Sequence, residues 1–121
     1  MNSRTEIDAL LNDYMQGLFT GDVERLRSVF HPQANLFGDV RGAPYQNSLD
    51  GWLEAIGGRT SPADLGEEFR MEALDIEIIN DIAFAKLNSP MLGFNYYDYL
   101  ALVRHGERWL ITNKLFTHVG A

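Results

Sequence analysis

Residues 94–118 read FNYYDYLALVRHGERWLITNKLFTH, and this stretch indicates the fold more clearly than any other part of the chain. Two segments rich in aromatic and aliphatic residues, 92–104 and 107–118, flank His105-Gly106, a pair that suits a tight turn. We therefore expect two long antiparallel strands joined by a hairpin. Asp98 lies in the most apolar part of the first strand, where an ionised group is costly unless another group pairs with it. This carboxylate is the leading candidate for chemistry or ligand recognition.

The segments before this hairpin extend the sheet and supply its helices. Residues 68–79 and 82–89 are also β-rich, and a short strand over 35–40 is expected at the sheet edge. Apolar residues at helical spacing predict three helices, which run from Ser3 to Gly21, from the N-cap Asp22 to Pro32, and from the N-cap Ser48 to Gly57-Gly58. The sequence thus predicts one α+β domain over residues 1–121, with three helices packed on a curved, mostly antiparallel sheet and a loop over 58–66.

Composition and charge limit the functional classes. The chain has 121 residues, of which 45% are hydrophobic and 12% aromatic, as in globular proteins with one core. Its formal net charge of −7 makes nucleic acid and anionic membranes poor partners, because both are bound mainly by clustered Lys and Arg. No apolar run approaches the roughly 20 residues that span a bilayer, and the acidic N-terminus is unlike a secretory signal, so we expect a cytoplasmic location.

The sequence gives no sign of a metal or cofactor site. It contains no cysteine, which excludes disulfides and thiolate ligands. Its histidines are scattered, and neither His-x-x-x-His spacing nor a glycine-rich nucleotide-binding motif is present. We therefore expect neither a bound metal nor a cofactor.

Three stretches together carry a resemblance to a known superfamily. They are Tyr14 followed by Gly21-Asp22, the segment 26–34, and the segment 98–116. In these stretches the chain resembles the nuclear transport factor 2-like superfamily, which includes ketosteroid isomerase and SnoaL-type cyclases, and within it the lumazine-binding group. The resemblance implies a cone-shaped α+β barrel, whose helices and concave sheet enclose a pocket open at one end.

The same resemblance suggests part of a catalytic site. Ketosteroid isomerase uses an Asp base and an oxyanion hole formed by a Tyr and a protonated Asp. Tyr14 and Asp98 fall where that Tyr and that protonated Asp would be. Gly38 occupies the position of the base, and Asp39, one residue later, points to the opposite face of a regular strand unless a bulge reorients it. The chain therefore carries half of an isomerase site, and whether it is an enzyme is left open.

Strand pairing gives an independent expectation for Asp98. If His105-Gly106 forms a two-residue turn, Asp98 lies opposite Asn113, and both face a pocket that is apolar at its deep end. A three-residue turn would place Lys114 opposite Asp98 as a buried ion pair. We favour the first register because it leaves Lys114 pointing away from the core.

The expected pocket combines one acid with several aromatic side chains. Its candidate ligand-binding residues, besides Asp98 and Tyr14, are Phe30, Phe37, Trp52, Tyr96 and Asn113. Burial among them would favour the neutral carboxylic acid of Asp98, which could donate a hydrogen bond to a ligand carbonyl. The alternative is a structural acid that accepts hydrogen bonds from Asn113 or Tyr14 and meets no ligand.

The opposite face of the same strand predicts an interface. Tyr97, Tyr99, Ala101 and Val103 are too apolar to be left in water, so we expect burial against a second copy of the chain. Members of the resembled superfamily commonly dimerise through the outer sheet face. Both arguments predict a homodimer.

Three functions are compatible with these observations. The first is a pocket protein that binds a small, mostly apolar or aromatic molecule. The second is an acid/base enzyme of the isomerase, dehydratase or cyclase type using Asp98, for which a reoriented Asp39 is the available second group. The third is a structural or interaction domain whose cone is filled by its own aromatic side chains. The sequence does not identify the ligand.

Overall fold

The computed structural model describes residues 2–120. Within this range the chain forms two helices, two strands, a third helix and then four strands. The elements are α1 (Ser3–Thr20), α2 (Val23–Arg27), β1 (Phe30–Val40), β2 (Ala43–Ser48), α3 (Leu49–Gly57), β3 (Glu72–Ile79), β4 (Ile82–Met91), β5 (Phe94–His105) and β6 (Arg108–Val119).

Side-chain caps and glycine set the bounds of the helices. Helix α1 begins at Ser3, as predicted, and Asn2 is its N-cap, because the Asn2 side chain accepts a hydrogen bond from the Thr5 backbone N–H at 2.8 Å. It ends at Gly21, which adopts a left-handed conformation with φ of 70°. Asp22 and Ser48 cap α2 and α3, as the sequence predicts.

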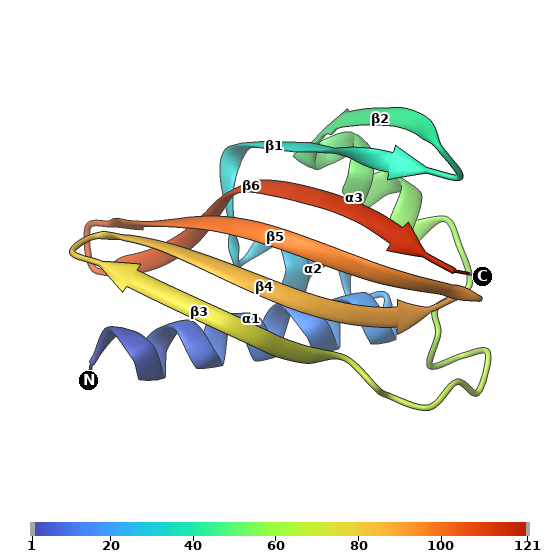
Figure 1. Ribbon diagram of the computed structural model, residues 1–121, viewed down its shortest axis with the longest axis horizontal. Helices are drawn as coiled ribbons and strands as arrows, with labels where there is room; N and C mark the ends of the chain where they lie inside the picture. Colours follow the sequence, from blue (N-terminus) through green and yellow to red (C-terminus); the bar gives the residue numbers. More distant parts are fainter. Residues whose placement is uncertain (1, 121) are drawn as a thin grey trace.

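The strands form one sheet in the order β2-β1-β6-β5-β4-β3 (Figure 1). Strands β3 to β6 are the predicted antiparallel meander, and β1 joins it by pairing in parallel with β6. The strand expected over 35–40 exists, but it starts at Phe30 and lies inside the sheet, since β2 adds another strand at the edge. The sequence does not reveal β2, because its residues are mostly polar and exposed and include a proline.

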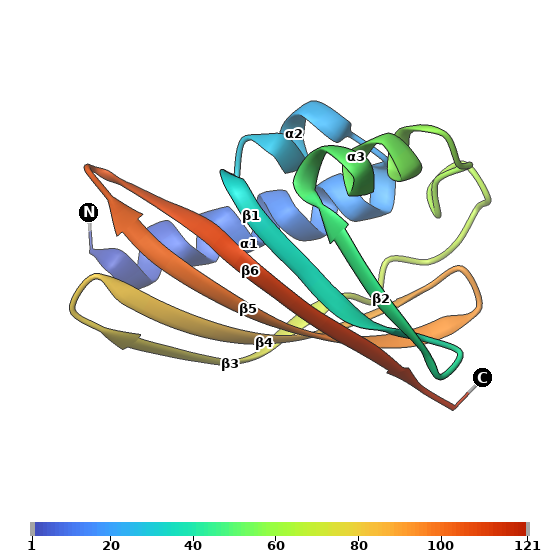
Figure 2. The same ribbon diagram turned by 90° about the horizontal axis from the view of Figure 1, so that it is seen from above.

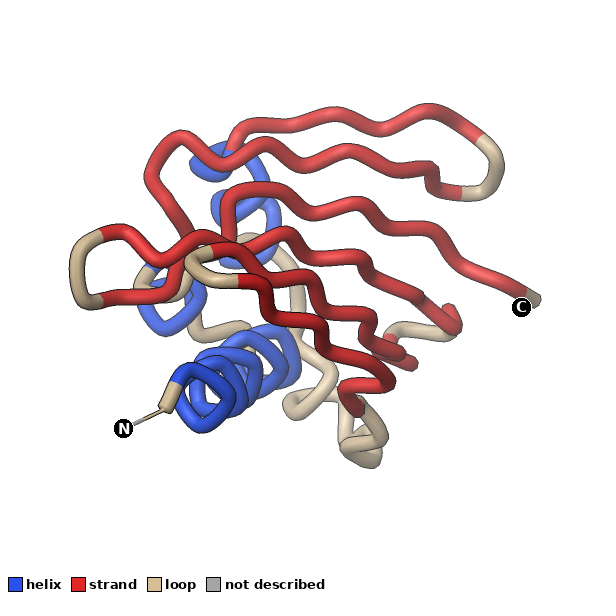
Figure 3. Tube along the Cα trace, turned by 60° about the vertical axis from the view of Figure 1, so that its left-hand side comes forward, coloured by secondary structure: helices blue, strands red, loops and turns tan. Residues whose placement is uncertain are grey.

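All three helices lie against one face of the sheet, which curves around them and remains unclosed (Figures 2 and 3). The core between the two layers includes Ile7, Leu11 and Tyr14 from α1 and Leu53 and Ile56 from α3. This is the predicted α+β architecture. The loop after α3 returns to α1, where the Ala63 N–H donates a hydrogen bond to the Phe19 carbonyl oxygen at 2.9 Å.

The predicted register of the last hairpin is wrong. The turn residues are Gly106 and Glu107, and a bulge at Thr112 adds one unpaired residue to β6. Beyond this bulge Asp98 lies opposite Phe116, and neither Asn113 nor Lys114 pairs with it. Because an extra residue reverses the alternation of side chains, Lys114 points into the core instead of Asn113.

Candidate functional site

A cavity of about 170 Å³ lies between α3 and the concave face of the sheet. Its apolar lining comes from Leu18, Val40, Trp52, Ile56, Met91 and Phe116. Its polar lining comes from Tyr45, Arg59, Ser89, Tyr96, Asp98 and Lys114. The volume is below the roughly 300–1,000 Å³ that is usual for drug-sized ligands, so the cavity suits a small molecule.

Asp98 is held at the cavity wall by two hydroxyl groups. Its side chain is only 2% exposed. The Tyr14 hydroxyl donates a hydrogen bond to Oδ2 at 2.8 Å, and the Ser89 hydroxyl donates a longer one to the same oxygen at 3.4 Å. Among residues 2–120 we find no donor to the other oxygen, Oδ1, so this atom remains available to a ligand.

Tyr14 supports Asp98 from behind and is not part of the cavity lining. Burial raises the pKa of the Tyr14 phenol well above its usual value, and the nearby Asp98 acts in the same direction. The hydroxyl is therefore a stable donor at neutral pH, and its donated proton is engaged by Asp98. In this structure the two groups form a linked pair that presents only the carboxyl group to the cavity.

Lys114 is a cavity-lining residue that the favoured sequence register placed on the wrong side of β6. Its side chain is 5% exposed and its Nζ atom lies 4.5 Å from the ring centre of Trp52. The rings of Phe116 and Tyr14 are at 5.2 and 5.3 Å. Burial lowers the pKa of Lys114, and Arg59 lowers it further, whereas Asp98 opposes this effect.

Arg59 contributes a second cation from the loop after α3. This residue is exposed overall and lines the cavity, and partial burial lowers the pKa of its guanidinium below the usual value. The guanidinium remains protonated at any physiological pH. Close to it, burial raises the pKa of Tyr96, and the positive charge of Arg59 opposes this rise. The cavity therefore brings two cationic side chains close to one carboxyl group.

The remaining sequence-predicted site residues divide into two sets. Trp52 and Tyr96 line the cavity, whereas Phe30 packs behind it, with ring centres 5.4 Å from Trp52 and 6.0 Å from Tyr14. Phe37 is 42% exposed and lies outside the cavity, because the neighbouring Leu36 takes the inward position on β1. Asn113 also lies outside the cavity, as a consequence of the bulge at Thr112.

Within the described residues, no second acidic side chain lines the cavity beside Asp98. Asp39 accepts a hydrogen bond from the Thr117 hydroxyl at 2.9 Å and does not line the cavity. At Gly38, a Cβ atom would collide with the carbonyl oxygen of Phe116 on the neighbouring strand. The position at which the resemblance placed a catalytic base therefore has no room for a side chain. Among residues 2–120 no group of three or more His, Cys, Asp or Glu side chains is arranged to hold a metal ion.

Solved structures with the same fold come from several bacteria. A protein from Silicibacter pomeroyi has a TM-score of 0.88 and 20% identity, with 98% of this chain and 100% of that chain covered. A protein from Shewanella baltica has a TM-score of 0.86 and 22% identity, with 100% and 99% covered. Both are described as nuclear transport factor 2-like proteins of unknown function, and the likeness shows that this chain has their fold.

A comparison of the sequence with models of protein families identifies the family of this chain. A family model described as "Putative lumazine-binding" matches residues 2–117, and the chain belongs to this family. None of the curated proteins is similar enough to count as a match. Within the described part of the chain, no helix is long and apolar enough to cross a bilayer.

Proposed function

We propose that the protein binds a small, mostly apolar or aromatic molecule in the cavity beside Asp98. The observation that carries this proposal is the cavity itself, which combines aromatic walls with a buried carboxyl group whose Oδ1 atom has no partner among the described residues. Trp52, Tyr96 and Phe116 offer ring faces and edges to a flat ligand. A cone filled by its own side chains is supported less well, since about 170 Å³ remains open.

The test is a ligand screen by thermal shift, with the family's namesake lumazine and simple aromatic acids, amides and alcohols as probes. We expect at least one class to raise the melting temperature in a saturable manner, because a ligand that binds only the folded state stabilises it. Asp98→Asn and Trp52→Leu should reduce this shift. Phe84→Leu is the control, because Phe84 lies on the opposite face of the sheet, and this variant should retain the thermal shift. No shift with any probe would count against the proposal.

One observation favours a second candidate, an acid/base enzyme. Lys114 and Asp98 line the same cavity, and burial lowers the pKa of the Lys114 amine toward values at which it can exchange protons. Lys114 would thus be the second acid/base group beside Asp98, a role that Asp39 cannot fill because it does not line the cavity. Hydrogen–deuterium exchange of an α-proton in a bound ketone, followed by NMR, tests this candidate. Exchange that is unchanged in Lys114→Met would remove it.

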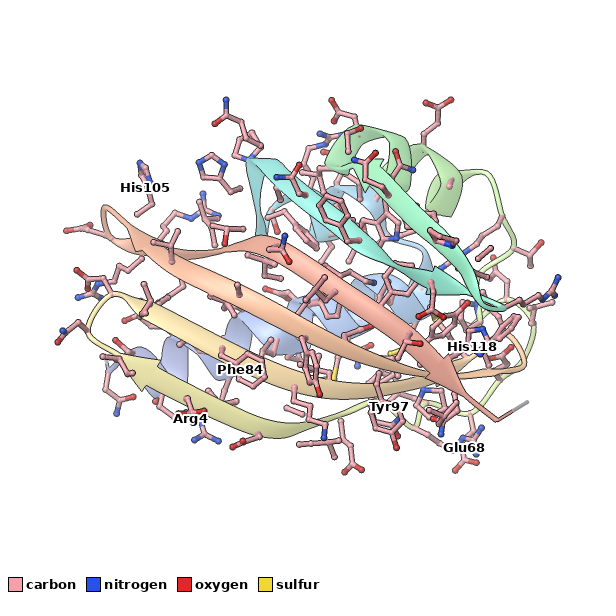
Figure 4. The ribbon with its side chains drawn as sticks, turned by 45° about the horizontal axis from the view of Figure 1, so that its top comes forward. Arg4, Glu68, Phe84, Tyr97, His105 and His118 are labelled. Carbon is pink, nitrogen blue, oxygen red and sulfur yellow. The ribbon has the colours of Figure 1, made fainter. Side chains whose placement is uncertain are left out.

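We further propose that the protein forms a homodimer through the sheet face that no helix covers. Figure 4 shows Phe84 and Tyr97 on this outer face. The outer face also carries Tyr99, Leu115 and Val119, which are between 46% and 49% exposed and line a groove of about 490 Å³. An exposed apolar patch of this kind favours association.

A further inference from the structure

We propose that the ligand carries a carboxylate group, bound between Lys114 and Arg59, with its apolar or aromatic body against Trp52, Tyr96 and Phe116. This inference rests on the proposed binding function and adds the charge of the ligand to it. Three features of the cavity support this inference. They are a buried lysine that makes no ion pair with any described residue, a second cation that lines the same cavity, and a lining with fewer acidic than basic side chains.

The lysine is the first of these features. Lys114 is almost fully buried and lines the cavity, yet it makes no ion pair with any described residue. Lysine is almost never buried without a partner, because removing an ammonium group from water is costly. The surrounding rings offset part of this cost. A ligand anion would supply the partner that the protein does not provide.

The second feature is Arg59, which also has no ion-pair partner among residues 2–120. Arginine presents a planar array of donors that matches a carboxylate, and it binds such groups through two parallel hydrogen bonds. Its exposed side chain lies at the cavity and can adjust to an entering ligand. Lys114 offers a point charge deeper inside, so the two cations can bind one carboxylate from two sides.

The third feature is the charge of the lining as a whole. Within the part of the chain that the structure describes, Asp98 is the only acidic residue that lines the cavity, and one of its oxygens is already engaged by Tyr14 and Ser89. The chain as a whole has a net charge of −7, so an excess of cations in this cavity is contrary to its composition. A carboxylate near Lys114 would favour the protonated amine, as Asp98 does, and binding and protonation would reinforce each other.

The experiment compares benzoate with benzamide, which has nearly the same shape but no charge. Each probe is titrated into the isotopically labelled full chain, and the dissociation constant is read from the indole N–H signal of Trp52 by NMR. We expect benzoate to bind about tenfold or more tightly than benzamide, as is usual for a hydrogen-bonded charge. Equal or tighter binding of benzamide would overturn the inference while leaving the binding function intact.

Matched variants assign the effect to the two cations. Lys114→Met and Arg59→Gln should each reduce the affinity for benzoate about tenfold and leave that for benzamide nearly unchanged. Lys86→Met is the control, because Lys86 also lies near an aromatic ring, but on the outer face of the sheet. Unchanged benzoate binding in both cavity variants would also overturn the inference. If neither probe moves the Trp52 signal, the inference and the binding of small aromatic molecules both fail.

Discussion

At position 114 the chain places an ammonium group among three aromatic rings and gives it no acidic partner within the described residues. Such an arrangement reduces the stability of the ligand-free protein, since the charged amine loses its hydration. Proteins commonly have a lower folding stability where a side chain is placed for binding or catalysis. The role of Lys114 can therefore be tested by measuring protein stability as well as ligand binding.

We predict that Lys114→Met stabilises the ligand-free protein by about 1–3 kcal/mol near pH 7. In the folded protein the pKa of Lys114 lies below its usual 10.5. At pH values between the folded-state pKa and 10.5, the Lys114 amine is therefore protonated in the unfolded chain but largely neutral in the folded one. Wild-type stability should rise with pH in this window, and the advantage of the variant should shrink toward pH 10.5. Urea unfolding at a series of pH values measures both effects. A destabilised variant at neutral pH would contradict this reading of Lys114.

The pair of Tyr14 and Asp98 leads to a second prediction at this scale. Tyr14→Phe removes the 2.8 Å hydrogen bond to Asp98 Oδ2 and leaves only the longer one from Ser89. We expect the free energy of unfolding to fall by about 1–3 kcal/mol, because a buried carboxyl group loses its main donor. Tyr99→Phe, at an exposed position, is the control. Equal stability of the two variants would show that the Tyr14 hydroxyl does not support Asp98.

At the scale of the elements, the contact between β1 and β6 sets the shape of the cavity. Gly38 pairs with Phe116 in the parallel ladder, and the backbones approach so closely there that a Cβ atom has no space. Phe116, on the other side of this contact, lines the cavity. Glycine is needed at position 38 for the close approach of the strands, and its place in the sheet excludes a catalytic side chain there.

We therefore predict that Gly38→Ala destabilises the protein by about 1–3 kcal/mol through overpacking. Gly58→Ala is a matched control, because Gly58 has an ordinary right-handed conformation and its added Cβ would meet only normal contacts. It should leave stability nearly unchanged or raise it slightly. Thermal or urea unfolding of both variants decides the matter. If Gly38→Ala were as stable as the control variant, the two strands would not be as tightly fixed as described.

The elements also show how far the sequence predicts this structure. Helical spacing and caps locate the starts of the helices, and alternating apolar residues locate the meander. The predicted end of the second helix at Pro32 is wrong, because α2 ends at Arg27 and β1 begins at Phe30. The bulge at Thr112 could not be predicted, because an isolated extra residue leaves no pattern in a strand that is apolar on both faces. The sequence therefore predicts Asp98, Trp52 and Tyr96 at the pocket, but the register that it favours places Asn113 there in the position that Lys114 occupies. Arg59 lies in a loop, where periodicity gives no information on side-chain direction.

For the whole molecule, the sheet separates two surface regions to which we assign the proposed functions. The concave side holds the cavity, and the outer face carries a groove lined by Tyr97, Tyr99, Leu115 and Val119. Figure 4 shows Phe84 and Tyr97 on this outer face. The two regions share strand β5, in which Asp98 points inward while Tyr97 and Tyr99 point outward. A partner on the outer face would therefore buttress the strand that presents Asp98.

We predict a particle of twice the 13.7 kDa chain mass in solution, and a shift toward the monomer for Leu115→Glu. Leu115 is 47% exposed on the outer face, where a buried carboxylate would oppose association. Leu65→Glu is the control, since Leu65 is 56% exposed in the loop after α3. Light scattering coupled to size-exclusion chromatography measures the masses. A monomeric wild type at micromolar concentration would contradict the proposed interface.

The central claim is that the cavity beside Asp98 and Lys114 binds a small molecule. Its most direct test is an NMR titration of the wild-type protein with benzoate and lumazine, following the indole N–H signals of Trp52 in the cavity and Trp109, which does not line it. We predict a saturable shift of the Trp52 signal, with little change at Trp109, for at least one of the two compounds. No saturable change at Trp52 with either compound would contradict the proposed binding site.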